Sequence, residues 1–141
     1  MGLERFIEAQ CTAYDIAFNE IKNGRKRSHW IWYIFPQLKG MGHSFNSEYF
    51  GLNGIAEAKA YLNHPVLRIR LREITEELLK HQDKSSVALM GSRIDSIKLC
   101  SCMTLFEYVS PADVFSQVLE CFYNGKRDGM TLKMIENNNQ Q

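Results

Sequence analysis

Apolar residues recur every three or four positions along most of the chain, which is the pattern of amphipathic helices. In the first segment the positions with this spacing are Leu3, Phe6, Ile7, Gln10, Tyr14, Ala17, Phe18 and Ile21. Gly24 follows at a point where glycine commonly ends a helix. The sequence therefore predicts a long N-terminal helix that stops before Gly24.

Proline and histidine mark a boundary between two further helices. Pro65 disfavours helix at the residue before it and suits the first turn of a new one, which His64 is expected to cap. The new helix has a regular inward face, made of Leu67, Leu71, Ile74 and Leu78.

Serines mark the remaining helix starts. Ser92 and Asp95 have the spacing of a capping box, in which both side chains accept from backbone N–H groups. Apolar residues surround the whole circumference of the helix that follows, as is typical of a central helix. Ser110, with Pro111 in the first turn and Asp113 as its partner, predicts the next helix, which Gly125 ends.

Runs that alternate apolar and polar residues over strand length are absent, so a sheet is not expected. We predict an all-α fold, with residues 1–141 forming one compact multi-helical domain of about five to seven helices. An irregular segment rich in aromatic residues and glycines spans residues 24–54, and a frayed polar tail is expected at 137–141.

Composition narrows the classes of partner. The formal net charge of the 141 residues is only +1, so nucleic acid is not an expected partner, and electrostatic recognition would need a local patch. The chain shows neither a secretory signal nor an apolar run of the roughly 18 residues that a membrane span needs. We therefore expect a cytoplasmic protein without a membrane partner.

The cysteines and the common motifs suggest neither a metal nor a cofactor. Cys11, Cys100, Cys102 and Cys121 lack the paired spacing of zinc ligands and lie in apolar surroundings, which favours buried free thiols. The phosphate-binding glycine motifs and the HExxH and GxSxG signatures do not occur.

Cations and indoles crowd the start of the irregular segment, "RKRSHWIWYIFPQLKGMGHS". Arg25 and Lys26 could complement the dipole of the preceding helix, or they could clamp a phosphate or carboxylate. Trp30 and Trp32, two positions apart, cannot share one helix face. Either both belong to the core, or one of them stacks on the ring of a ligand.

Histidine and other polar groups extend this candidate site. Positive neighbours favour a neutral His29 imidazole that accepts a proton, although a structural histidine would explain the same residue. Gln37, Ser44 and Tyr49 would suit a pocket wall, but a loop needs similar residues for its own backbone.

Asp95 and Lys98 lie in the first turns of the apolar helix. A cap and an ion pair three residues apart account for both side chains without a function. Alternatively, both face a polar cavity, in which Asp95 acts as an acid or base and Lys98 holds an anion.

Four stretches carry a resemblance that covers nearly the whole chain: "GRKRSHWIWYIFPQLKGMGHS", "AEAKAYLNHPVLRIRL", "IKLCSCMTLF" and "FYNGKRDGMTL". Together they resemble the bacterial family catalogued as domain of unknown function 1810. The resemblance implies an all-α, multi-helical domain and brings no established reaction. The family pattern has a glycine and two serines where this chain has Arg68, Cys100 and Cys102, and Ser101 would retain one hydroxyl there.

These features predict a pocket for an anionic small molecule of the nucleotide or ADP-ribose type, hydrolysed at a glycosidic or phosphate bond. His29 and Asp95 are the candidate catalytic residues. The candidate ligand-binding residues are Arg25, Lys26, Trp30, Trp32, Gln37, Ser44, Tyr49, Lys98 and Ser101. The alternative is a non-enzymatic protein-interaction module that uses the tryptophan- and arginine-rich segment. The oligomeric state stays open.

Overall fold

The computed structural model describes residues 2–139, which form nine helices. They are α1 (Glu4–Lys22), α2 (Ile31–Ile34), α3 (Phe45–Phe50), α4 (Ile55–Asn63), α5 (Leu67–Leu79), α6 (Ser86–Met90), α7 (Arg93–Val109), α8 (Val114–Tyr123) and α9 (Gly129–Asn139). Extended pairing in this range is limited to one isolated parallel bridge between Leu38 and Leu52. The all-α class is confirmed, whereas the number of helices exceeds the predicted five to seven.

The additional helices are short. α2, α3 and α6 have four, six and five residues. Helices of this length are unstable alone because nucleation is costly, so packing and caps must hold them. The Ser44 hydroxyl accepts from the Ser47 N–H at the start of α3, and Ser85 caps α6 in the same way. A hydrophobic period cannot show over so few residues.

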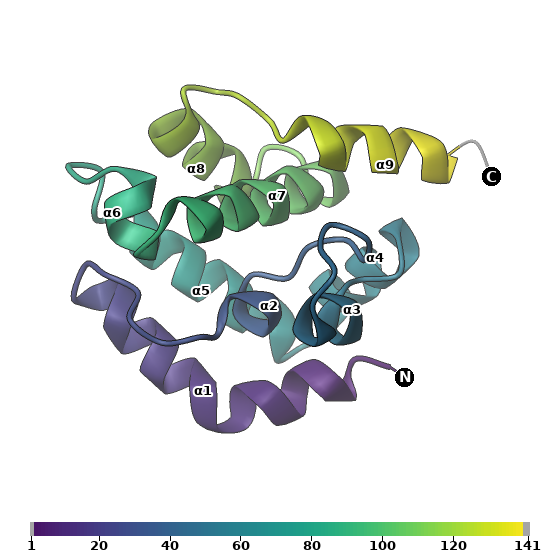
Figure 1. The fold of residues 1–141 in the computed structure, drawn as a ribbon, viewed down its shortest axis with the longest axis horizontal. Coiled ribbons are helices and arrows are strands. Elements are labelled where there is room, and N and C mark those ends of the chain that lie inside the picture. The colour runs from purple at the N-terminus through teal and green to yellow at the C-terminus, as the bar shows by residue number, and fades with distance from the viewer. Residues whose placement is uncertain (1, 140–141) are drawn as a thin grey trace.

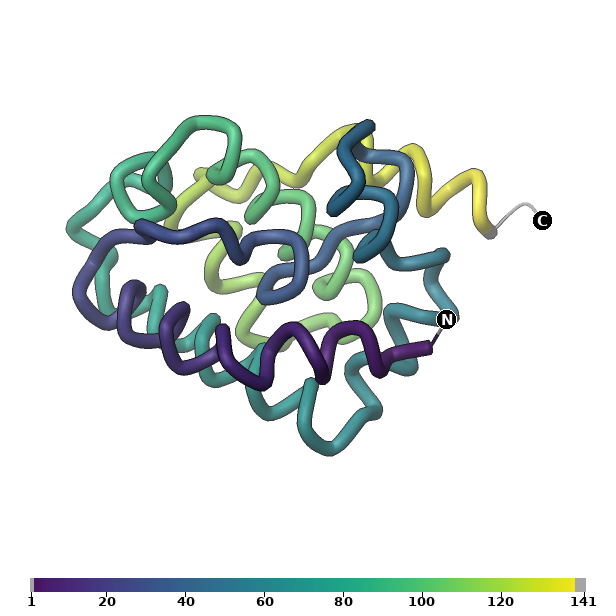
Figure 2. Tube along the Cα trace, turned by 60° about the horizontal axis from the view of Figure 1, so that its bottom comes forward, coloured from purple at the N-terminus to yellow at the C-terminus, as the bar shows by residue number. Residues whose placement is uncertain are grey.

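Two helices, α5 and α7, organise the others. α7 packs against α2, α4, α6, α8 and α9, and α5 packs against α1, α4 and α8. Figure 1 shows α1 on one side of the molecule and α9 on the opposite side, with α7 between them, and Figure 2 shows the same separation after rotation. Within residues 2–139, no helix is both long and apolar enough to cross a bilayer.

Most of the predicted helix ends are observed. Gly24 follows α1 with φ of +88°, the left-handed conformation that glycine adopts easily. The His64 Nδ1 accepts from the Val66 N–H, and the Ser92 hydroxyl accepts from the Asp95 N–H. α5 begins only at Leu67, so Pro65 precedes the helix and, contrary to the prediction, does not lie in its first turn. The predicted cap of α8 is wrong: Asp113 accepts from the Val114 N–H, while Ser110 donates to the Asp113 carboxylate.

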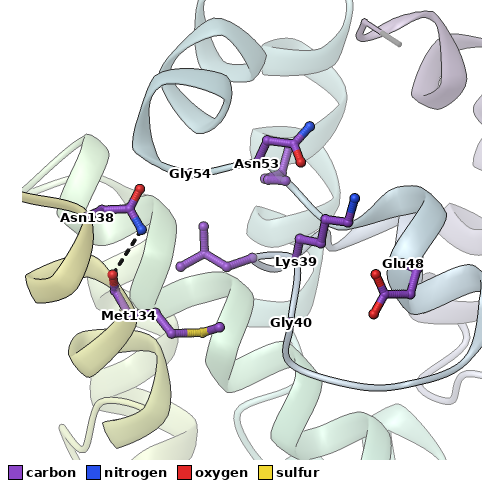
Figure 3. Close-up of a pocket in the computed structure, with 9 residues that line it drawn as sticks. Lys39, Gly40, Glu48, Asn53, Gly54, Met134 and Asn138 are labelled. Atoms are coloured by element: carbon purple, nitrogen blue, oxygen red, sulfur yellow. Dashed lines mark hydrogen bonds between the residues drawn. The ribbon is translucent and has the colours of Figure 1, made fainter. Parts of the chain in front are cut away.

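The C-terminal helix crosses the irregular segment (Figure 3). A Cβ on Gly40 would lie 2.9 Å from the Met134 Cε, and one on Gly54 would lie 2.7 Å from the Asn138 Oδ1. The two glycines therefore allow α9 to approach closely. α9 continues to Asn139, so residues 137–139 of the predicted frayed tail are helical, and residues 140–141 lie outside the described range.

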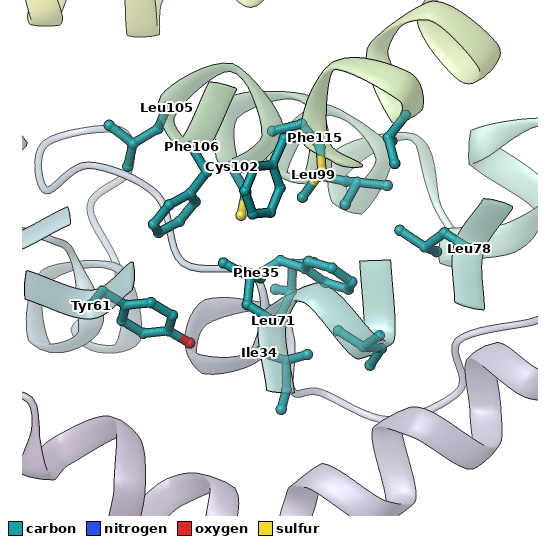
Figure 4. Packing of buried hydrophobic residues seen from close by; sticks show 14 of the residues in the cluster. Ile34, Phe35, Tyr61, Leu71, Leu78, Leu99, Cys102, Leu105, Phe106 and Phe115 are labelled. Carbon is teal, nitrogen blue, oxygen red and sulfur yellow. The ribbon is translucent and has the colours of Figure 1, made fainter. Parts of the chain in front are cut away.

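The core fills the space between α5, α7, α8 and the segment around α2 (Figure 4). The Phe106 ring lies 5.5 Å from the Tyr61 ring and 5.7 Å from the Phe115 ring. Only residues 101–106 of α7 are buried all round. Ile94 and Ile97 before them are 65% and 52% exposed, and Tyr108 after them is 43% exposed. The expectation of a wholly apolar environment for α7 is therefore wrong at both ends.

The cysteines also differ from the expectation of buried thiols. Cys102 is buried and Cys100 is partly buried, but Cys11 and Cys121 are exposed. Their helices are amphipathic, and these two thiols lie on the polar faces. All four are free thiols, as predicted.

We predict that Phe106→Ala lowers the free energy of unfolding by about 3–5 kcal/mol, because it opens a cavity between two aromatic rings. Ile94→Ala on the same helix should change it by less than about 0.5 kcal/mol, because the side chain is exposed. Urea denaturation followed by circular dichroism measures both. Equal losses for the two variants would contradict the difference in burial between these two positions of α7.

Candidate functional site

Asp95 lies between two lysines. The Lys26 Nζ is 2.8 Å from the Asp95 Oδ2, and the Lys98 Nζ is 3.9 Å from the Asp95 Oδ1. Lys26 also donates to the Ser28 carbonyl oxygen. The Lys26 side chain is only 5% exposed, compared with 17% for Asp95 and 25% for Lys98. Residues from the loop after α1 and from the start of α7 are thus brought together.

Each ammonium group lies over an indole. The Lys26 Nζ is 5.0 Å from the Trp30 ring centroid, and the Lys98 Nζ is 4.8 Å from the Trp32 ring centroid. Such cation–π contacts are worth about 0.5–2 kcal/mol. Trp30 is 1% exposed and belongs to the core, whereas Trp32 is only partly buried. The two indoles therefore separate into one core side chain and one nearer the surface.

A hollow of about 170 Å³ opens beside this cluster. Its lining residues are Lys26, Arg27, Ser28, His29, Met90, Gly91, Ser92 and Asp95. The exposed His29 thus shares the hollow with Asp95, while Lys98 and the indoles lie outside its wall. Small-molecule pockets usually have volumes of about 300–1,000 Å³. This hollow can enclose a phosphate or a sugar, and the rest of a nucleotide would extend over the surface.

Backbone contacts fix the two walls of the hollow against each other. The Lys26 N–H donates to the Leu89 carbonyl oxygen over 2.8 Å. Gly91, with φ of +82°, lies so close that a Cβ there would be 2.7 Å from the Lys26 carbonyl oxygen. A side chain at position 91 would push the loop away from α7.

Other candidate residues from the sequence have separate positions. Gln37 lines a different small hollow with Trp32, and Ser44 caps α3. Tyr49 lines a hollow near the N-terminus with Arg5. The Ser101 hydroxyl is buried and donates to the carbonyl oxygen of Ile97 in its own helix.

Arg25 is exposed, and its side chain does not line the hollow of Asp95. Of the candidate residues, Lys26, His29, Asp95 and Lys98 form the local cluster, with Trp30 and Trp32 beneath the two ammonium groups. Within residues 2–139, no group of three or more histidine, cysteine, aspartate or glutamate side chains could hold a metal ion.

Glu20 is a residue that the sequence reasoning missed. Its carboxylate accepts from the Arg27 N–H at 2.7 Å, from the Ser28 N–H at 2.9 Å, from the Ser28 hydroxyl and from the Trp30 Nε1–H at 2.9 Å. These bonds hold the loop that carries Lys26 and His29. Its one sequence signal is an acidic residue in the last turn of a helix, where the helix dipole disfavours it.

The same bonds determine the ionisation of Glu20. Partial burial opposes the charged form, but the hydrogen bonds from Ser28, Arg27 and Trp30 outweigh burial and lower the pKa to about 2. Because this pKa is below the ordinary 4.5, the fold gains stability from the ionised carboxylate. That contribution is complete above the ordinary pKa and is lost as the pH falls towards about 2.

Known proteins resemble this small all-α chain in sequence and in structure. Residues 1–135 match the family described as "Protein of unknown function (DUF1810)", and the chain belongs to this family, as the resemblance implied. The chain is also similar to a solved structure, the conserved hypothetical protein Rv1873 from Mycobacterium tuberculosis, with 38% identity and a TM-score of 0.91. That match covers 95% of this chain and 96% of the other. No curated protein sequence matches the chain.

We predict that Glu20→Gln lowers the free energy of unfolding by about 2 kcal/mol near neutral pH, because charge-assisted hydrogen bonds to the loop are weakened. The difference from the unchanged protein should shrink as the pH falls below the ordinary carboxyl pKa. Urea denaturation across a pH series measures it, with the exposed Glu8→Gln on the same helix as the control. A difference that is constant with pH would argue against an ionised Glu20 anchor.

We predict that Lys26→Met and Asp95→Asn each lower the free energy of unfolding by about 2–3 kcal/mol, because each leaves a largely buried charge with fewer partners. The double variant should lose at least about 1 kcal/mol less than the two single losses combined. Lys59→Met, at an exposed lysine outside the ion pairs of the described residues, is the control and should change the free energy of unfolding by less than about 0.5 kcal/mol. Additive losses would show that Lys26 and Asp95 are not coupled.

Proposed function

We propose that this protein binds an anionic small molecule of the nucleotide or ADP-ribose type at the hollow of Asp95. The observation that supports this most is the pinning of one carboxylate between two ammonium groups, beside an imidazole, in a hollow open to solvent. Such a group of charges is preorganised to bind a polar ligand and to act on it.

The anion would meet the cations of this cluster that are held least tightly. Lys26 is held by Asp95 and Ser28, so it mainly sets the position of the carboxylate. Lys98 lies at the longer distance of 3.9 Å and is more exposed, so its ammonium can turn towards a ligand. Arg27 is exposed at the rim, and the hollow lies at the N-terminal end of α7, where the helix dipole favours negative charge.

The ring of the ligand would stack on the indole of Trp32. Trp32 is partly exposed, and its ring lies beneath the Lys98 ammonium group that pairs with Asp95. A nucleobase could replace the ammonium over the indole, a stacking contact worth about 1–3 kcal/mol. The small volume of the hollow agrees with this arrangement, because only the phosphate or the ribose needs to be enclosed.

The reaction that we propose is hydrolysis at the ribosyl carbon. The Asp95 carboxylate takes a proton from water as the water oxygen bonds to that carbon, and the bond to the leaving group breaks. In the complex the anionic ligand offsets the positive neighbours of His29, so the imidazole can carry a proton and give it to the leaving group, and the charges balance over the step. Both side chains line the same hollow, which is the geometric requirement.

The alternative of a protein-interaction module has less support. It needs Trp30 and Trp32 as exposed anchors of an interface. Trp30 is 1% exposed, and its Nε1–H donates to Glu20 inside the protein. The aromatic residues of this segment thus pack mainly inward.

We predict that ADP-ribose, ADP or ribose 5-phosphate binds, with weaker binding as the ionic strength rises. Lys98→Met should weaken the affinity about tenfold, equivalent to about 1.4 kcal/mol, because a cation at the ligand is lost. Isothermal titration calorimetry measures this, with the exposed Lys126→Met as the matched control.

Chromatography of the reaction products separates binding from catalysis. Asp95→Asn should retain binding and lose turnover of the bound compound, because an amide is not a general base. If none of the three compounds binds at low ionic strength, the proposed function is wrong. Binding without turnover by the unchanged protein would reject only the hydrolytic step.

A further inference from the structure

A second hollow, of about 300 Å³, lies between the irregular segment and α9 (Figure 3). It shares no lining residue with the hollow of Asp95. Its floor is apolar and consists of Leu38, Leu52 and Met134. The leucines are almost fully buried, and a backbone bridge holds them, with the Lys39 N–H donating to the Leu52 carbonyl oxygen over 2.8 Å. The floor is therefore rigid on one side, while Met134 can adapt from the other.

Two opposite charges flank this apolar floor. Lys39 comes from the loop after α2, and Glu48 comes from α3. Figure 3 shows both on the wall opposite α9. Neither side chain takes part in any of the ion pairs formed within residues 2–139. An unpaired cation and an unpaired anion at one end of an apolar hollow are complementary to a molecule with both charges at one end.

We propose that this hollow binds a free α-amino acid with an apolar side chain. Lys39 binds the carboxylate of the amino acid, Glu48 binds its ammonium group, and the side chain lies on Leu38, Leu52 and Met134. The volume is at the lower limit for small-molecule pockets, which suits a ligand of this size.

The charges also exclude other classes of ligand. Glu48 would repel the phosphates of a nucleotide and the head of a fatty acid, since a carboxylate and an anion of like charge are not favourable neighbours. A simple amine would leave Lys39 unused. This site is thus distinct in chemistry from the proposed anion site and independent of it.

A titration followed by ¹H–¹⁵N NMR tests the proposal. L-Leucine and L-methionine should shift the backbone amides of residues 38–54 and 134–138. N-acetyl-L-leucine lacks the ammonium group, L-leucinamide lacks the carboxylate, and glycine lacks the apolar side chain. Each of these three should bind at least about tenfold more weakly than leucine.

Two charge variants and one control complete the experiment. Lys39→Met and Glu48→Gln should each weaken leucine binding at least about tenfold, and because both side chains are exposed, the variants should retain the native spectrum. Lys133→Met, on α9, should bind like the unchanged protein. The proposal is wrong if neither amino acid shifts these amides, or if N-acetyl-L-leucine binds as well as leucine.

Discussion

The ion pair between Lys26 and Asp95 is the contact on which the arrangement of the candidate site depends. It joins the loop after α1 to the first turn of α7, and both side chains are largely buried. A buried pair of charges is favourable only if their remaining hydrogen-bonding capacity is also met. Here the Ser28 carbonyl oxygen, the Trp30 ring and Lys98 supply that compensation. The loop is thus held by a connected set of contacts rather than by one bridge.

The ion pair between Lys26 and Asp95 is a costly way to stabilise a fold, because both charges lose most of their hydration when they are buried. An apolar pair of similar volume often stabilises a protein as well as a buried ion pair does. The surrounding core already supplies apolar packing, with Trp30, Ile31 and Phe35 almost fully buried beside the loop. A fixed carboxylate beside an open hollow is a feature that apolar side chains cannot supply, and it supports the proposed role in binding.

The sequence predicted features that depend on neighbouring residues better than features that depend on contacts between distant parts of the chain. Local signals, such as the inward face of α5 and the caps at His64 and Ser92, were sufficient to predict those elements. The approach of Lys26 to Asp95, 69 positions along the chain, follows from tertiary packing, and the sequence could offer it only as a hypothesis. Glu20 was missed for the same reason, since its partners lie in a loop whose path no local pattern describes.

The two hollows arise from one structural cause. In each, the irregular segment lies against a helix at a glycine that permits the close approach, Gly91 before α7 and Gly40 under α9. Such loop backbone cannot pack as regularly as two helices do, so polar side chains from different elements meet at these places. At α7 the opposite charges pair and are buried, and at α9 they remain apart and exposed. The same segment therefore lines one hollow with a fixed carboxylate and another with two separate charges, so the ligands that we propose for them differ in class.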